Sequence, residues 1–111
     1  MTYDKENIFA KILRKEIPCE PVFENDSILA FKDINPQAKM HVLIIPKGEY
    51  VDISDFIQSA PLAEISSFWK SVDELLINLN LKDKGFQIKT HKGKDGGQEV
   101  FHFHLHLLST I

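Results

Sequence analysis

The chain has 111 residues, of which 43% are apolar and 26% are charged, enough for one hydrophobic core without disulfides or a structural metal. The 13 basic and 16 acidic residues give a formal net charge of -3. This charge excludes a protein that coats nucleic acid by overall attraction, although a local site for one small anion stays open. The only cysteine, Cys19, excludes an internal disulfide and a zinc site of paired cysteines, and it suits a reducing compartment.

The N-terminal sequence MTYDKENIFAKIL is charged early and lacks the apolar core of a signal peptide. The apolar run at 42–45 is far too short to cross a membrane. We therefore expect a single domain over residues 1–111, located in the cytoplasm, without membrane or nucleic-acid partners.

The first quarter of the sequence predicts a helix followed by a hairpin. Residues 7–15 form a helical pattern that Asn7 or Asp4 can cap. Its apolar residues share one stripe: Ile8, Phe9, Ile12 and Leu13. Two strand-like pieces follow at 21–25 and 27–33, with a turn at Asn25-Asp26.

The middle of the sequence predicts a buried strand and a long helix. Residues 34–40 have the composition of a loop, and the apolar run at 41–46 predicts a strand that is buried on both faces. Pro61 suits the first turn of a helix over 61–80. This helix carries more apolar residues, including Phe68 and Trp69, than one face of a small sheet needs. We therefore expect some of them at the symmetric interface of a homodimer.

The last quarter alternates in the manner of strands. Residues 85–91 place Phe86, Ile88 and Thr90 on one face and Gln87, Lys89 and His91 on the other. A glycine-rich turn at 92–98 precedes a strand at 100–108. The order of helices and strands predicts an α+β fold with a mainly antiparallel sheet.

Three histidines occupy every second position of the last predicted strand. Side chains alternate along a strand, so His102, His104 and His106 share one face. The opposite face, toward the core, carries Phe101, Phe103, Leu105 and Leu107. One interpretation is a solvated face that happens to be rich in histidine.

A second interpretation is a metal site. His102 and His106 lie about 13 Å apart at roughly 3.3 Å per residue, so all three histidines converge poorly on one zinc ion. Two of them with His41 or His91 stay open as ligands.

We prefer a third interpretation, phosphate chemistry. A neutral imidazole can attack phosphorus while a protonated neighbour neutralises the phosphate oxygens. The turn DGGQE, just before the strand, can supply backbone N–H donors to an anion.

The segment HFHLHLL matches the histidine-triad pattern of three histidines alternating with apolar residues. Together with IFAKILRKEIP and LAFKDINPQAKMHVLIIPK, it makes nearly the whole chain resemble the histidine triad nucleotide-binding branch of the histidine triad (HIT) superfamily. The resemblance implies a HIT-like fold with a five-stranded antiparallel sheet and two main helices. It also implies a homodimer that binds purine nucleotides such as AMP and hydrolyses nucleoside 5′-phosphoramidates, with no metal and no cofactor.

The resemblance assigns roles by position. His104 takes up the nucleotidyl group, His106 contacts the phosphate, and the carbonyl of His102 holds the Nδ1–H of His104. The other implied nucleotide-binding residues are Asp33 and Ile34 at the ribose and base, His41 as a fourth histidine, Gly97, Gln98 and Glu99 at the phosphate, and Phe9 and Ile12 at the base. Without the resemblance, Asp33 would be a turn residue, and Phe9 and Ile12 would equally well be core residues of the helix.

Two positions depart from the family pattern. His91 stands where many members have an asparagine near the ribose, and it can act as a donor there. Members usually continue after the triad with Gly-Gly and a tail that reaches the partner's active site, whereas this sequence ends in LLSTI. Preference for the leaving group therefore does not carry over. A dinucleoside polyphosphate hydrolase and a nucleotide- or partner-binding module with little turnover are the alternatives.

Overall fold

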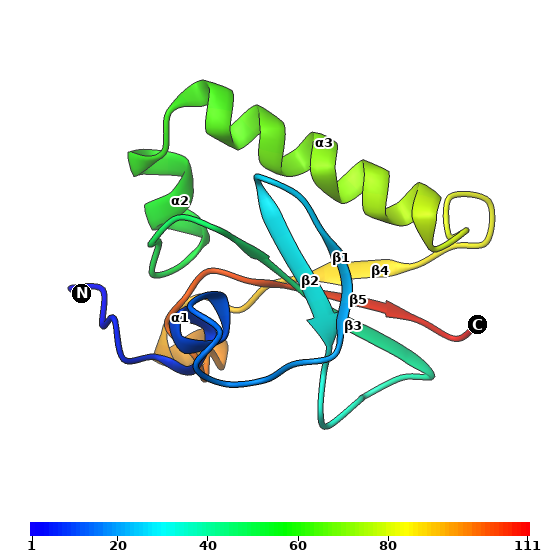
Figure 1. Cartoon of the computed structure of the whole chain (residues 1–111), viewed down its shortest axis with the longest axis horizontal. Coiled ribbons are helices and arrows are strands. Elements are labelled where there is room, and N and C mark those ends of the chain that lie inside the picture. Colours follow the sequence, from blue (N-terminus) through cyan, green and yellow to red (C-terminus); the bar gives the residue numbers. More distant parts are fainter.

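The computed structural model describes residues 1–111 and places five strands in one antiparallel sheet with helices on both faces (Figure 1). The strands are β1 (Pro21–Glu24), β2 (Ile28–Lys32), β3 (Met40–Pro46), β4 (Gln87–Lys89) and β5 (Leu105–Ser109), in the spatial order β1-β2-β3-β5-β4. The helices are α1 (Ile8–Leu13), α2 (Ile53–Ser59), α3 (Leu62–Asn78) and the short 3₁₀ helix η1 (Lys94–Gly96). This arrangement confirms the predicted α+β class. No helix is both long enough and apolar enough to span a membrane.

The sheet separates two hydrophobic cores of different size. The larger core has 14 buried residues and lies under α3 and α2, and the smaller has 6 and lies under α1, on the other face (Figure 1). Strand β3 contributes to both, with Val42 and Ile44 in the larger core and Leu43 and Ile45 in the smaller. This confirms the strand predicted at 41–46 and its burial on both faces.

Local side-chain bonds set the ends of the early elements, as the sequence predicts. The side chain of Asn7 accepts a hydrogen bond from the backbone N–H of Ala10 (2.9 Å) and caps α1. Asn25 Oδ1 accepts from the N–H groups of Ser27 and Ile28 at the hairpin turn. The predicted apolar stripe of α1 is wrong at Ile8, which is 43% exposed.

Helix α2 has no counterpart in the predicted elements. Asp52 Oδ1 accepts from the N–H of Asp55 (2.8 Å), and Asp55 Oδ2 accepts in return from the N–H of Val51 (2.8 Å). This reciprocal arrangement resembles a capping box and explains why the helix begins at Ile53. The helix inserts the fully buried Phe56 into the larger core.

Helix α3 confirms the long helix, but only part of its apolar surface is free. Phe68 is 1% exposed and belongs to the larger core, so it is not available to a second subunit. Trp69 is 40% exposed, Ile77 57% and Leu62 81%. The expectation of excess apolar surface therefore holds for these three residues and is wrong for Phe68.

The strand predicted at 100–108 is shorter than expected. β5 begins only at Leu105, because the N–H of Phe103 donates to the carbonyl of Tyr50 (2.7 Å) and not to a neighbouring strand. The inward alternation still holds for Phe103, Leu105 and Leu107, which lie in the larger core. Phe101 is only half-buried and lies outside both cores, which corrects its predicted place.

Candidate active site

A cavity of about 800 Å³ opens on the α1 face of the sheet. It gathers residues from α1, β2, β3, β4, β5 and the loop after η1. Ten of the predicted site residues line it: Phe9, Ile12, Asp33, Ile34, His41, His91, Gly97, Glu99, His104 and His106. Gln98 and His102 do not line it.

His104 presents a free lone pair to this cavity. Its Nδ1–H donates to the backbone carbonyl of His102 (2.7 Å), as expected, so Nε2 carries no hydrogen. Nε2 has no partner in the protein, and it reaches the cavity surface, since no buried side-chain nitrogen or oxygen lacks a hydrogen bond. Burial lowers the pKa of His104 below its usual range, so the ring is neutral at pH 7.

His106 presents the opposite group, an N–H donor. The backbone N–H of Gln37 donates to His41 Nδ1 (3.0 Å), which leaves the hydrogen of His41 on Nε2. His41 Nε2 lies 2.9 Å from His106 Nδ1, so His106 accepts there and keeps its own hydrogen on the unpartnered Nε2. Two neighbouring rings, 5.1 Å apart, therefore offer a lone pair and a donor.

The pKa values of His104 and His106 are both lowered, so these two rings are neutral at pH 7 before a phosphate binds, whereas the sequence interpretation has a protonated neighbour beside the phosphate. Burial, followed by the nearby charges of His104 and His41, lowers the pKa of His106 to about 4. The neutral ring of His106 can donate a hydrogen bond from Nε2 to a phosphate that enters the cavity. The negative charge of that phosphate then raises the pKa of His106.

Asp33 forms the turn that its sequence position suggests and also lines the cavity, where its contact with a ribose stays a prediction. Its Oδ1 accepts from the N–H of Asn35 (2.8 Å) and forms a turn, while Oδ2 lies 3.3 Å from His41 Nε2. Ile34, beside it, is 89% exposed at the cavity rim. Phe9 and Ile12 likewise belong to the smaller core and line the cavity.

The phosphate loop supplies fewer donors than predicted. The N–H groups of Gly96, Gly97 and Gln98 bond to carbonyls of Gly93 and Lys94 inside the loop.

The side chain of Gln98 is also occupied. It donates to the carbonyls of Val51 (2.7 Å) and Val100 (3.0 Å) and accepts from the N–H of Gly93 (2.9 Å). Gln98 therefore holds the loop together and does not line the cavity, and its contact with a nucleotide stays a prediction. The free backbone donors are those of Glu99 and Val100, which both line the cavity.

His102 supports the site from outside the cavity. Its ring is fully buried, with Nε2 donating to the carbonyl of Pro46 (3.1 Å) and Nδ1 accepting from the hydroxyl of Tyr3 (2.6 Å). Because both ring nitrogens are occupied, His102 touches no substrate. This agrees with the supporting role expected for His102, which holds His104 through its carbonyl.

Two further residues of the site are absent from the sequence interpretation. Lys89 lines the cavity and lies directly opposite His106 in the register of β4 and β5. Its ammonium group forms no ion pair. The alternation at 85–91 already placed it on the face of His91, so a signal existed. His91 itself lies 5.1 Å from His106, ring to ring. Nothing in the sequence indicates that Tyr3 contacts the site, because a single tyrosine in a charged N-terminal segment belongs to no repeating pattern of side chains.

The donor atoms of Asp33, His41 and His106 lie within 4.8 Å of one another, close enough to suggest a metal site. A metal ion takes the lone pair of a neutral imidazole nitrogen, while the other ring nitrogen donates its hydrogen. His41 has the reverse arrangement, since Nδ1 accepts from Gln37 and the hydrogen occupies the Nε2 that faces the other two donors. This donor set does not fit a metal ion.

We expect prolonged chelation to leave turnover unchanged, because His41 offers a hydrogen where a metal needs a lone pair. The measurement compares the initial rate of nucleotide release before and after dialysis against EDTA. A rate that falls and returns on addition of Zn²⁺ would contradict this and support the metal interpretation.

Comparison with known proteins identifies the family. The sequence matches the model of the HIT domain over residues 14–110. An uncharacterized HIT-like protein of Azospirillum brasilense is 47% identical over 108 residues, which cover 97% of this chain and 88% of that protein.

Two solved structures share the fold. A HIT family hydrolase from Clostridium thermocellum superposes with a TM-score of 0.85 at 33% identity, covering 97% of this chain and 93% of that one. A histidine triad nucleotide-binding protein from Candida albicans gives a TM-score of 0.80 at 31% identity, covering 92% and 73%. The histidine pattern, the sheet and these matches agree: the chain belongs to the HIT domain family of the histidine triad superfamily.

Proposed function

We propose that the chain is a purine nucleotide-binding hydrolase that cleaves nucleoside 5′-phosphoramidates through a nucleotide covalently bound to His104. The observation that carries the proposal is the pair of unpartnered Nε2 atoms in one cavity, a lone pair on His104 and an N–H on His106. A nucleophile beside an anion donor is what transfer of a phosphoryl group requires.

The first step forms a P–N bond and breaks another. His104 Nε2 attacks phosphorus, and the amine leaves with the electron pair of the substrate P–N bond. The amine nitrogen needs a proton as it leaves, and the candidate carriers at this end of the cavity are Glu99 and His106, which the bound phosphate helps to protonate. The retained hydrogen bond from Nδ1 to the carbonyl of His102 stabilises the positive charge on the modified ring.

The second step returns the enzyme to its starting form. Water attacks phosphorus and gives its proton to the carrier that protonated the amine, the bond to His104 breaks, and AMP leaves. We place the nucleoside at the apolar end of the cavity, between the walls formed by Phe9 and Ile34, with a ribose hydroxyl on the free lone pairs of Asp33. The phosphate then meets the backbone donors of Glu99 and Val100.

Names of two relatives support this assignment. The structure from Clostridium thermocellum is named a hydrolase, and the one from Candida albicans a nucleotide-binding protein. The direct test incubates purified protein with adenosine 5′-phosphoramidate and follows release of AMP. Rapid quenching in base followed by mass spectrometry should find an adenylate on the peptide that contains His104. A protein that binds AMP without any turnover would instead be a binding module.

We expect kcat/KM for an adenosine phosphoramidate to exceed that for a diadenosine polyphosphate by about tenfold or more, or about 1.4 kcal/mol. A phosphoramidate nitrogen accepts a proton more readily than a bridging oxygen, so the same acid assists it more. A second phosphate chain also needs positive charge, which Lys89 alone supplies near His106, while Glu99 adds a carboxylate to the same lining. Parallel assays of kcat/KM for the two substrates measure this preference. An equal or reversed preference would favour the dinucleotide hydrolase.

We further expect the protein to be a homodimer. Leu62, Trp69 and Ile77 are exposed at intervals of about two helical turns, so they share one side of α3. Light scattering at micromolar concentration should give twice the mass of one chain. Trp69→Glu should shift this mass toward the monomer, and Lys70→Glu, an exposed neighbour, serves as the control. A wild-type monomer would contradict the expectation.

A further inference from the structure

The phenol of Tyr3 reaches from the N-terminal segment to the ring of His102. Its hydroxyl lies 2.6 Å from His102 Nδ1, and the two rings meet edge to face with centroids 5.6 Å apart. We propose that Tyr3 is a positioning residue that fixes His102 and thereby holds the attacking nitrogen of His104 in its reactive tautomer and orientation. The proposal rests on the function proposed above for His104.

The ring of His102 has no freedom in this arrangement. Nε2–H donates to the carbonyl of Pro46 at the end of β3, so Nδ1 carries the lone pair that accepts from Tyr3. A neutral imidazole has one donor and one acceptor, and each has one partner here. The ring is fully buried, so no solvent can replace the hydroxyl without an opening of the structure. Tyr3 therefore completes the set of contacts that fixes the plane of His102.

One peptide unit transmits this position to the nucleophile. The carbonyl of His102 and the N–H of Phe103 belong to the same planar group. The carbonyl accepts from His104 Nδ1 (2.7 Å), and the N–H donates to the carbonyl of Tyr50 (2.7 Å). A change in the backbone at His102 therefore moves the acceptor of His104 directly.

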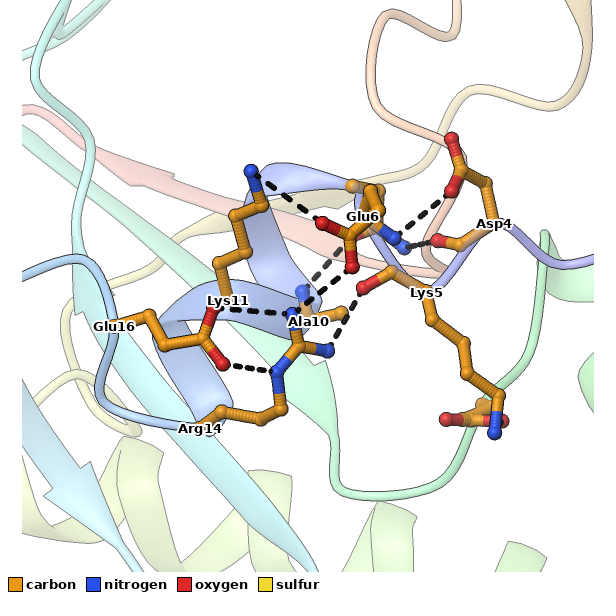
Figure 2. Close-up of polar contacts among 9 residues, drawn as sticks. Asp4, Lys5, Glu6, Ala10, Lys11, Arg14 and Glu16 are labelled. Carbon is orange, nitrogen blue, oxygen red and sulfur yellow. Dashed lines mark hydrogen bonds and ion pairs between the residues drawn. The ribbon is translucent and has the colours of Figure 1, made fainter.

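The N-terminal segment is itself attached to α1. Asn7 Nδ2 donates to the carbonyl of Asp4 (2.7 Å), and Arg14 Nη1 donates to the carbonyl of Lys5 (2.8 Å). Figure 2 shows the side chain of Arg14 pointing back at Lys5, in the segment that precedes the helix. Tyr3 thus approaches His102 from a backbone that is anchored by hydrogen bonds, and α1 sets its position.

The variant Tyr3→Phe isolates the hydroxyl, because it retains the ring and its edge contact. Burial lowers the pKa of His102 to about 4, and a donor on Nδ1 further favours the neutral form. Without that donor, the pKa of His102 should rise by about one pH unit. The carbonyl of His102 then holds His104 less firmly, and part of the population carries its hydrogen on Nε2, where it cannot attack.

The experiment compares wild type, Tyr3→Phe and Asp4→Ala with adenosine 5′-phosphoramidate as substrate. Asp4→Ala removes a side-chain hydrogen bond of the same segment, to the N–H of Glu6 (2.8 Å), and it keeps both carbonyl anchors to Asn7 and Arg14, so the phenol stays in place. We expect Tyr3→Phe to lower kcat about tenfold with KM unchanged, since no nucleotide contact is altered. We expect Asp4→Ala to retain wild-type kcat.

A second readout does not depend on turnover. ¹⁵N NMR of the imidazole rings reports the tautomer of His104 and the titration of His102. In Tyr3→Phe, we expect His102 to titrate at higher pH and the Nδ1–H form of His104 to decline. Wild-type kcat together with unchanged ring signals would overturn the proposal, and so would equal losses in Tyr3→Phe and Asp4→Ala.

Failure of the proposed function gives a different result. Wild-type protein that releases no AMP overturns the reaction assigned to His104, whatever Tyr3 does. The ring signals then decide alone: a shifted His104 tautomer in Tyr3→Phe retains Tyr3 as the residue that positions this ring, and an unshifted one overturns that as well.

Discussion

Replacement of His104 by alanine should reduce turnover by roughly 10⁴-fold while AMP still binds. The variant removes the imidazole whose unpartnered lone pair lies beside the N–H donor of His106. The apolar wall, Asp33 and the backbone donors of Glu99 stay in place, so the affinity for AMP should change little. Single-turnover kinetics and calorimetric titration measure the two effects separately.

Two comparisons make this result specific. His106→Ala removes a donor and leaves the nucleophile, so its kcat should fall by about 10²-fold, less than for His104→Ala. His104→Gly leaves a space for the ring, and added imidazole should restore part of the turnover. Near wild-type activity in His104→Ala would show that the triad has been assigned wrongly.

Replacement of Phe103 by alanine should lower the free energy of unfolding by about 3–5 kcal/mol. Phe103 is fully buried, stacks on Phe56 at 5.0 Å and lies 5.4 Å from Phe68, ring to ring. Its removal leaves a cavity in the larger core, which relaxes only in part. A loss of this size is a large fraction of the 5–15 kcal/mol that typically holds a domain together.

Urea unfolding measures the loss. Phe86→Ala is the matched control, because Phe86 is 39% exposed and belongs to neither core, so its cost should be under about 1 kcal/mol. Equal losses would mean that the aromatic cluster around Phe103 does not carry the stability assigned to it.

Features that depend on neighbours in sequence could be predicted. The cap at Asn7, the turn at Asn25 and the double burial of β3 follow from side-chain chemistry and periodicity within a few residues. The capping pair before α2 belongs to the same class, so this helix was predictable from Asp52 and Asp55 even though the sequence interpretation omitted it.

Features that depend on distant partners could not be predicted. Histidines and apolar residues alternate through residues 100–104, but the strand begins only at Leu105. The backbone N–H of Phe103 bonds to the carbonyl of Tyr50 and not to a neighbouring strand. The tautomer of His106 depends on His41, 65 residues away. Gln98 looked like a phosphate contact, since only the structure reveals that its amide bonds to Val51.

The two unequal cores divide the work of the molecule. The wall at which we propose the base binds belongs to the smaller core, which the sheet separates from the aromatic cluster under α3. Substitutions at Phe9 or Ile12 can therefore reshape the nucleoside end while the packing of Phe56, Phe68 and Phe103 stays intact. A substitution in that wall therefore costs stability in the smaller core, while the sheet shields the larger core, and with it most of the buried apolar side chains, from the change.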